Sequence, residues 1–580
     1  MILNRRRRQP RSPQPTERLR AITPYRVPRL LAPIDLALDG NEGPPPDAER
    51  LAVAARHLSA AINRYPATAA LQQLWAKRLG VRPDRVRITA GADEAIDRVV
   101  RTFVGPGREM LTTAPTFEMF ERYCALAGGR YVSVPWTEGT LPVEALLSRV
   151  TARTAVIAIA TPNNPTGTTA RSSELLALAA GAPGTVVLAD LAYVEFADED
   201  PTPALLDCPN VIVTRTMSKA RGLAGLRVGC AAGPADLIGW LTAAGNPYPV
   251  SGLSISLAMA SFEADEDRVG EAVAEVRIER DALARFLEPF ALRVWPSQAN
   301  FVLAEFRDAQ WIWEALAGLG IGVRRFPGRP GLEQALRIGC PGNAGDFGRL
   351  QRGLEAALAP QALIFDMDGV LADVSASFDA AIVRTAASFG VSVEPSDVWE
   401  AKQAGRANND WELTRRLMAA RGADHPLEVV TERFEQIYQG SPEAPGLCNL
   451  EGTIPPRPLL DRLAARLPLG VVTGRPRRDA LRFLERCGLA ERFRVVVTME
   501  DAPGKPDPAP VALALERLGV ERAWLVGDTP DDVTAARAAG VVPIGVVAPG
   551  HPPDPMRRAL TEAGAGRVLG NLAELEGLLR

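Results

Sequence analysis

Two groups of residues in this 580-residue chain have the types and spacing that chemistry requires. The first group, between residues 154 and 229, combines amide, carboxylate, phenol, amine and guanidinium groups: Asn164, Asp190, Tyr193, Lys219 and Arg227. The second group, between residues 363 and 532, combines carboxylates with a hydroxyl and an amine: Asp366, Asp368, Thr473, Lys505 and Asp528. An amine near a buried carboxylate suits chemistry on a bound aldehyde, and clustered carboxylates beside a lysine suit phosphoryl transfer. The sequence therefore predicts two sites.

In the first group, Lys219 and Asp190 predict a cofactor. Lys219 follows an apolar strand and a Thr-Met-Ser turn, where its amine can attack an aldehyde at a sheet edge and later act as a general base. Asp190 ends an apolar run, where a carboxylate is costly unless a positive group pairs with it. The protonated ring nitrogen of pyridoxal 5'-phosphate (PLP) is such a group, and PLP also carries an aldehyde. We therefore predict that PLP binds here.

Further residues of this group are suited to the remaining parts of PLP. Tyr193 and Asn164 can hydrogen-bond the 3-hydroxyl oxygen of the ring. Arginine offers the forked donor that phosphate prefers, and backbone N–H groups at a helix start bind phosphate as well. The predicted phosphate ligands are Ala92, Asp93, Thr216, Ser218 and Arg227.

The second group predicts a phosphomonoesterase. Asp366 and Asp368 leave an apolar strand two residues apart, so both can face one cleft. We expect Asp366 to be the nucleophile that forms an aspartyl phosphate, and Asp368 the general acid and later base. Thr473 and Lys505 are expected to bind the transferring phosphoryl group. The oxygen-rich set suited to Mg²⁺ is Asp366, Asp368 and Asp528, with Asp532 or Asp531 completing it.

Alternating strands and helices must position both groups. Short β-branched runs alternate with Ala/Leu-rich segments from about residue 85 to 350, and this pattern restarts after Pro360. Such alternation is typical of α/β folds with a mostly parallel sheet. Predicted strands are 86–89, 154–159, 185–188, 210–214, 362–365, 469–473 and 523–526. A mainly helical, charged insert at 376–456 follows the first strand of the second part, and we interpret it as a cap over that site.

Composition excludes several classes of function. A net charge of −3 and a pI near 6.0 give no drive toward nucleic acid or a membrane surface. Arg5–Arg8 could form an arm that binds nucleic acid, but we interpret them as part of a disordered, solvated tail. No apolar run is long enough to span a membrane and the start of the sequence lacks the apolar stretch of a signal peptide, so we expect a cytoplasmic protein. The six scattered cysteines are expected to be reduced.

The stretch from about residue 20 to 358 resembles the fold-type I aminotransferases of class I/II, and most closely the histidinol-phosphate aminotransferase family. The matching motifs are Asn41-Glu42-Gly43, Arg64-Tyr65-Pro66, Gly91 to Glu94, Pro115 to Phe120, Pro162 to Gly167, Thr216 to Arg227, Ala299-Asn300-Phe301 and Leu336-Arg337-Ile338. The resemblance implies that Phe117 stacks on the cofactor ring, without the hydroxyl of the family's tyrosine. It implies that Tyr65 reaches the cofactor phosphate of a partner subunit, hence a homodimer. It also implies that Arg337, with Arg324 as a second, binds the acidic end of the substrate.

The stretch from about residue 361 to 580 resembles the haloacid dehalogenase-like hydrolases that have a helical cap after the first motif. Asp368 favours a phosphatase, because dehalogenases of that superfamily lack the second aspartate; a phosphomutase is the weaker reading. Asn408, Asn409 and Trp411 are candidate pocket residues of the cap, although core or surface roles account for them equally well.

Together these observations predict an α/β chain with five parts. The first part is a disordered basic tail (1–20). An aminotransferase (21–358) follows, with a large domain at about 45–240 and a small domain from 21–44 and 241–358. The last two parts are a Rossmann-like hydrolase core (361–375 and 457–580) and its cap (376–456). The junction at Ala359–Gln361 is too short for a long flexible tether. We expect consecutive transamination of imidazole-acetol phosphate with glutamate and hydrolysis of the resulting histidinol phosphate. Such a fusion requires that the cap discriminate amine from ketone.

Two alternatives stay open at this point. One is an aminotransferase of another, aromatic amino acid or a phosphothreonine decarboxylase, with a phosphatase of unrelated substrate. The other is a regulatory module that binds PLP without turnover, against which stand the intact Lys219, Asp190 and Arg337.

Overall fold

The computed structural model describes residues 14–20, 22–46, 48–49, 52, 62–264, 266–405, 407, 409–441 and 444–579. Arg5–Arg8 and Asn408 lie outside the described residues. The chain forms two compact units, which are described separately below: unit 1 comprises Met1–Val27, Gly40–Glu305 and Arg337–Ala344, and unit 2 comprises Pro28–Asp39, Phe306–Leu336 and Gly345–Arg580. Residues 17–20, within the expected tail, form one helical turn, α1 (Glu17–Arg20).

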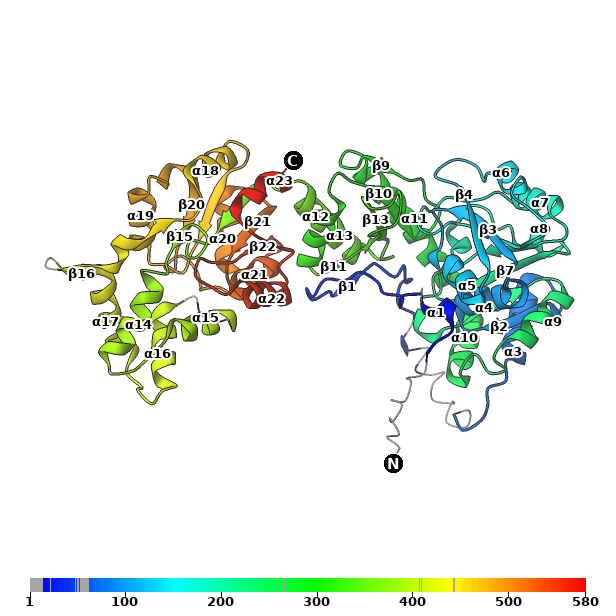
Figure 1. The fold of residues 1–580 in the computed structure, drawn as a ribbon, viewed down its shortest axis with the longest axis horizontal. Helices are drawn as coiled ribbons and strands as arrows, with labels where there is room; N and C mark the ends of the chain where they lie inside the picture. Colours follow the sequence, from blue (N-terminus) through cyan, green and yellow to red (C-terminus); the bar gives the residue numbers. More distant parts are fainter. Residues whose placement is uncertain are drawn as a thin grey trace, which may run out of the picture. The chain divides into compact units, whose positions relative to one another are not determined.

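Unit 1 is built on a seven-stranded sheet in the order β2-β8-β7-β6-β5-β3-β4 (Figure 1). Its strands are β2 (Val86–Thr89), β3 (Glu109–Ala114), β4 (Arg130–Pro135), β5 (Thr154–Ala160), β6 (Val186–Asp190), β7 (Val211–Thr216) and β8 (Gly229–Ala232). The neighbouring strands β4, β3, β5, β6 and β7 pair in parallel, whereas β8 runs antiparallel to both β7 and β2. The carboxyl ends of β5, β6 and β7 therefore meet at one edge.

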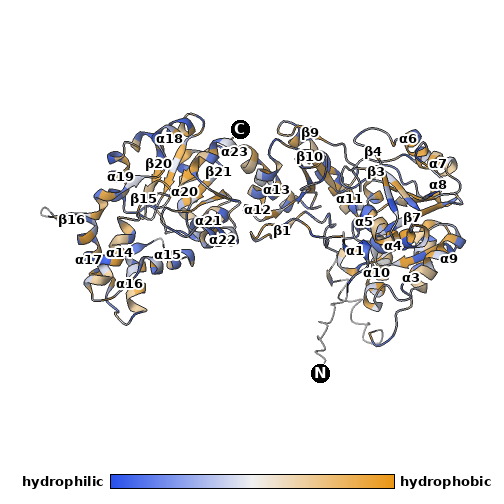
Figure 2. Ribbon diagram, viewed as in Figure 1, coloured by the Kyte–Doolittle hydropathy of each residue, from blue (hydrophilic) through white to orange (hydrophobic). Residues whose placement is uncertain are grey.

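The central strands of this sheet are apolar on both faces, because helices cover both. Val156 and Ala158 of β5 pack in one hydrophobic cluster, and Ile157 and Ile159 pack in another. Figure 2 shows stretches in the hydrophobic colour within both large sheets. The helices of unit 1 are α3 (Ala69–Leu79), α4 (Gly91–Phe103), α5 (Glu118–Ala127), α6 (Val143–Leu147), α7 (Ser172–Gly181), α8 (Thr202–Leu206), α9 (Ala235–Ala244), α10 (Gly252–Ala264) and α11 (Glu266–Leu287). β9 (Arg293–Val294) pairs antiparallel with β10 (Phe301–Glu305).

Unit 2 contains a six-stranded parallel sheet in the order β20-β19-β14-β21-β22-β23. Its strands are β14 (Ala362–Phe365), β19 (Leu469–Val472), β20 (Phe493–Val497), β21 (Ala523–Gly527), β22 (Val542–Val546) and β23 (Arg567–Leu569). The accompanying helices are α18 (Arg457–Ala464), α19 (Arg477–Arg486), α20 (Ala509–Leu518), α21 (Pro530–Ala538), α22 (Pro553–Ala563) and α23 (Leu575–Leu578). Since β19, β14 and β21 are adjacent, the residues that follow them converge.

Four helices follow β14 where the sequence predicts a cap: α14 (Phe378–Ser388), α15 (Pro395–Gln403), α16 (Asp410–Ala419) and α17 (Leu427–Gln439). The segments entering and leaving this group pair as the short antiparallel strands β15 (Ala372–Asp373) and β18 (Gly452–Thr453). A second short pair, β16 (Gly440–Ser441) with β17 (Ala444–Pro445), follows α17. Inside the group, the rings of Phe378 and Tyr438 lie 4.2 Å apart. The apolar side chains of these helices join one hydrophobic cluster with those of the hydrolase core.

Unit 2 also includes α12 (Ala309–Gly318), β12 (Arg324–Arg325), most of α13 (Ala344–Leu358), and the parallel pair β1 (Leu36–Ala37) and β11 (Ile321–Gly322). The ring centroids of Trp311 and Trp524 lie 4.7 Å apart, and the Trp524 indole N–H donates to the Ala356 carbonyl at 2.8 Å. Arg567 forms an ion pair with Glu314. These contacts pack α12 and α13 against the six-stranded sheet.

The α/β fold predicted from the sequence is confirmed. The predicted strands 86–89 and 362–365 match β2 and β14, and the other five differ from the observed strands by one or two residues at an end. β6 and β7 extend to Asp190 and Thr216, because these polar residues still pair with a neighbouring strand. Among the described residues, no helix combines the length and apolarity needed to cross a membrane.

Candidate active sites

The first site lies where β5, β6 and β7 of unit 1 end. Asp190, the last residue of β6, is 5% exposed and accepts a hydrogen bond of 2.8 Å from the Thr214 hydroxyl of β7. Burial raises the pKa of Asp190 to about 6, since the low-dielectric interior disfavours the charged form. A cation beside this carboxylate would offset the cost of burying it.

The Lys219 amine lies beside the segment that contains Asn41. Its Nζ donates to the Gly40 carbonyl at 2.9 Å and lies 5.5 Å from the centre of the Tyr193 ring. The Tyr193 hydroxyl in turn accepts a hydrogen bond of 3.1 Å from the Asn41 side chain. The amine and the phenol predicted to act on one cofactor are therefore neighbours.

The predicted phosphate ligands gather at the start of α4. The Thr216 hydroxyl donates to the Ser218 hydroxyl at 2.9 Å, and Arg227 Nη1 donates to the same Ser218 oxygen at 3.4 Å. Arg227 also pairs with the Asp93 carboxylate at 3.0 Å. Ala92 lies in the first turn of α4, whose N–H groups and dipole favour an anion.

Two glycines allow the start of α4 to lie close to β8 and to Arg227. Gly91 has φ +75°, and a Cβ there would lie 2.7 Å from Arg227 Nη2. A Cβ at Gly229 of β8 would lie 2.7 Å from the Gly91 carbonyl carbon and 3.0 Å from the Ala92 nitrogen. The start of α4 and the edge of β8 thus form a cradle that side chains would fill.

The two arginines predicted to bind the substrate, Arg337 and Arg324, are both buried. Arg337 Nη1 donates to Asn164 Oδ1 at 2.6 Å, and the Arg337 guanidinium lies 5.3 Å from the centre of the Phe301 ring. Arg324 belongs to unit 2, where its guanidinium lies 5.6 Å from the Phe326 ring centre. The contact between Arg337 and Asn164 joins the predicted substrate residue to the predicted cofactor residue; the role of Arg324 stays a prediction.

Two aromatic residues of the predicted set differ in their surroundings. Phe117 is partly buried and meets the Phe120 ring edge-on, with centroids 5.9 Å apart. Tyr65 is 81% exposed and stacks on Tyr248 at 4.6 Å. An exposed aromatic stack is available to a second subunit, as the predicted role of Tyr65 requires.

These residues fit PLP. The buried carboxylate of Asp190 would hold the protonated ring nitrogen, Tyr193 and Asn164 the ring oxygen, and the α4 cradle with Ser218, Thr216 and Arg227 the phosphate. When bound, PLP supplies an electron sink. Lys219 holds the amine that would attack its aldehyde and then move protons.

The second site lies where β14, β19 and β21 of unit 2 end. The carboxylates of Asp366, Asp528 and Asp532 each offer an oxygen within 4.8 Å of the others, and all three are buried. Burial, together with the neighbouring carboxylates, raises the pKa of Asp366 to about 7 and that of Asp528 well above its usual range. Three buried carboxylates this close together suit a divalent cation, which would neutralise them.

Lys505 balances part of this charge. Its Nζ lies 2.5 Å from Asp366 Oδ1 and also pairs with Asp532. Burial acts to lower the pKa of Lys505, but the charges of Asp366 and Asp532 outweigh it and raise that pKa. The amine is thus held as a cation beside the predicted nucleophile.

Of the two residues left open in the sequence, Asp532 lies in the carboxylate cluster. Asp531 instead accepts a hydrogen bond of 3.1 Å from the Ala407 backbone of the cap. Gly369, with φ +70°, leaves room for Asp528, since a Cβ there would lie 2.2 Å from its Oδ2. Thr473, which follows β19, is buried, and its hydroxyl accepts from the Arg475 backbone at 3.1 Å.

Asp368 is engaged by a residue to which sequence reasoning gave no role. Arg475 reaches Asp368 Oδ1 with Nη2 at 2.5 Å and with Nε at 2.6 Å, and it pairs with Glu451 at 3.0 Å. Arg475 is 2% exposed and stands in the Thr-Gly-Arg motif visible in the sequence. That motif was a signal for Arg475, whereas Glu451 stands in no motif. The side chain of Asp368 therefore faces Arg475, and its part in binding a metal stays a prediction.

These folds and sites define an aminotransferase joined to a hydrolase. The family described as aminotransferase class I and II matches residues 34–353, and haloacid dehalogenase-like hydrolase matches residues 360–540. The chain belongs to the class I and II aminotransferases and carries a haloacid dehalogenase-like hydrolase domain.

Several known proteins are similar to this chain. Histidinol-phosphate aminotransferases of Ruegeria pomeroyi and Roseiflexus castenholzii are 36% and 37% identical over 53% of this chain, which covers 88% and 87% of their lengths. The imidazoleglycerol-phosphate dehydratase of Phytophthora nicotianae is 50% identical over 197 residues, 33% of this chain and 44% of that protein. The chain thus spans less than half of that relative.

Among solved structures, the histidinol-phosphate aminotransferase of Sinorhizobium meliloti, in complex with pyridoxal-5'-phosphate, is similar with a TM-score of 0.53 and 28% identity. The match covers 59% of this chain and 96% of that one. The similarity supports the PLP site derived above.

Proposed function

We propose that this chain catalyses two consecutive reactions. The first is PLP-dependent transamination between glutamate and imidazole-acetol phosphate, which yields 2-oxoglutarate and histidinol phosphate. The second is Mg²⁺-dependent hydrolysis of histidinol phosphate through an aspartyl phosphate on Asp366. The observation that carries the proposal is that one chain brings two predicted sets of residues together: Lys219 beside Tyr193, and Lys505 between Asp366 and Asp532.

The substrate proposal also draws on the relatives. The names of the aminotransferase relatives refer to histidinol phosphate, and that of the Phytophthora relative refers to a second imidazole-bearing phosphate ester. A phosphatase on the same chain has an obvious use when the first product is a phosphate ester. Arg337, buried beside Asn164, is suited to bind the acidic end of substrates at the first site.

The same proposal includes the assembly and the compartment. The exposed Tyr65–Tyr248 stack supports a homodimer in which Tyr65 reaches the partner's cofactor. All six cysteines are free thiols, which agrees with a cytoplasmic enzyme.

A coupled assay tests the proposal. Purified protein with PLP and Mg²⁺ is given histidinol phosphate and 2-oxoglutarate, and both glutamate and free phosphate are followed. Both products are expected. Lys219→Ala should abolish glutamate formation and keep phosphate release, and Asp366→Asn should do the reverse. Absence of both products with the wild-type enzyme would reject the proposed substrate.

A further inference from the structure

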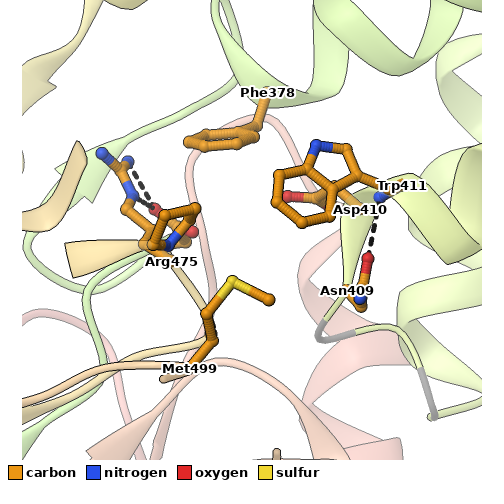
Figure 3. Close-up of a pocket in the computed structure, with 9 residues that line it drawn as sticks. Phe378, Asn409, Asp410, Trp411, Arg475 and Met499 are labelled. Carbon is orange, nitrogen blue, oxygen red and sulfur yellow. Dashed lines mark hydrogen bonds and ion pairs between the residues drawn. The ribbon is translucent and has the colours of Figure 1, made fainter. Parts of the chain in front are cut away.

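A small pocket, open to solvent, lies between the cap helices and the hydrolase core. Figure 3 shows that Phe378, Asp410 and Trp411 face it from the cap, and Arg475 and Met499 from the core. Asp368, the predicted general acid, also lines it. A phosphate ester held at Asp366 would therefore extend its organic part into this pocket.

The charges that line this pocket are unevenly balanced. Arg475 is paired with both Asp368 and Glu451, so its positive charge is already compensated. The Asp410 carboxylate, in contrast, forms no hydrogen bond or ion pair with any side chain in the part of the chain that the structure describes. Two carboxylates and one fully engaged guanidinium leave the pocket negative.

The surroundings of Asp410 make its negative charge costly. Burial and the charge of Asp368 raise its pKa to about 7, although Lys402 and Arg475 oppose the shift. The nearby Lys402 ammonium forms its ion pair with Asp379, at 2.6 Å, and not with Asp410. A ligand with its own positive charge would stabilise the ionised carboxylate.

We propose that Asp410 binds the ammonium group of an amine-bearing phosphomonoester, while Phe378 and Trp411 contact its apolar or aromatic part. The inference rests on the proposed function and deepens it, because histidinol phosphate carries such an amine and imidazole-acetol phosphate carries a ketone in its place. Asp410 thereby selects the product of transamination over its precursor and protects the intermediate from early hydrolysis.

The test compares amine and non-amine substrates in one enzyme preparation. The kcat/KM for phosphate release is measured with histidinol phosphate against imidazole-acetol phosphate, and with O-phosphoethanolamine against ethyl phosphate. Asp410→Asn should reduce the amine preference by roughly tenfold to a hundredfold, as loss of one charge-assisted hydrogen bond predicts. The change should appear chiefly in KM of the amine substrate. Asp424→Asn is the matched control, because this cap carboxylate is exposed and pairs with Arg415 outside the pocket.

Each outcome is decisive. A wild-type enzyme without amine preference, or an Asp410→Asn variant that keeps it, would overturn the role of Asp410 and leave the proposed function intact. Preference for O-phosphoethanolamine without turnover of histidinol phosphate would reject the proposed substrate and keep the inference. Hydrolysis of p-nitrophenyl phosphate without hydrolysis of either amine would overturn both.

Discussion

At the scale of single residues, Asp190 links the cofactor site to pH. Its pKa in the folded protein is about 6, against an ordinary value of 3.8. Because folding raises this pKa, the folded protein holds the proton more tightly than the unfolded chain does. The contribution of this group to the free energy of unfolding is fully present below the ordinary pKa and is lost as pH rises through about 6. Without PLP, the buried ionised carboxylate therefore destabilises unit 1 at neutral pH.

Replacing Asp190 by Asn should remove this dependence. In protein freed of PLP, we expect Asp190→Asn to be more stable than wild type by about 3 kcal/mol above pH 7, because a shift of roughly two pKa units corresponds to that energy. The difference should vanish near pH 4. Urea denaturation at several pH values measures it, and an advantage for Asn that does not change with pH would contradict the account.

Arg475 is the second residue with a large expected effect. Arg475→Met would leave Asp368 and Glu451 without their shared cation, and breaking a buried pair in this way costs about 3–5 kcal/mol. Phosphatase activity should fall as well, since Asp368 loses the group that orients it. Denaturation curves measure the stability change. Arg477→Met is the matched control: this exposed arginine pairs with Asp501, and its loss should cost less than about 1 kcal/mol.

The sequence alone was sufficient to predict the location of site residues that lie near the end of a strand. Asp190, Asp366 and Asp528 come within two residues of the ends of predicted strands, and Lys219 follows its strand after a short turn. The structure places these residues near the carboxyl ends of strands in the two large sheets. Glu451 and Asp410 could not be predicted. The neighbours of Glu451 and Asp410 come from distant parts of the chain, and only the packing of the cap against the core brings these residues together.

At the scale of elements, the approach of β8 to the start of α4 controls the phosphate cradle. A Cβ at Gly229 would lie 2.6 Å from the Arg215 carbonyl and 2.7 Å from the Gly91 carbonyl carbon. Gly229→Ala should therefore push α4 away, lower the free energy of unfolding by about 1–3 kcal/mol and weaken PLP binding. Titration of PLP by absorbance checks the binding. Gly184→Ala, where an added Cβ meets open space, should change neither quantity.

Element types were easier to predict than element partners. Apolar runs identified β2, β5, β6 and β7 of the first sheet and β14, β19 and β21 of the second, but not the remaining strands. The charged helical insert at 376–456 was recognised from its position after β14. The docking of α12 and α13 against the second sheet was not predicted. It depends on Trp311, Glu314 and Ala356 meeting residues of the hydrolase, and a tryptophan in an amphipathic helix does not indicate which surface covers it.

At the scale of the whole molecule, this docking predicts that the hydrolase depends on the preceding segment. Residues 361–580 alone would lose the Trp311 contact and the hydrogen bond from Trp524 to Ala356. We expect the free energy of unfolding of this piece to be about 3–5 kcal/mol lower than that of the hydrolase in the full chain, the usual cost of removing the packing of a large buried ring. A piece that begins at residue 345 keeps α13 and should be intermediate. Urea denaturation of the two pieces tests this, and equal stability would contradict it.

The central claim is that one chain carries out both steps in order. The most direct measurement starts from imidazole-acetol phosphate, glutamate, PLP and Mg²⁺, and follows phosphate release by wild type, Lys219→Ala and Asp366→Asn. The account predicts that phosphate release requires both Lys219 and Asp366, because the amine must form before the ester is hydrolysed. Phosphate release by Lys219→Ala at the wild-type rate would show direct hydrolysis of the ketone and contradict the account.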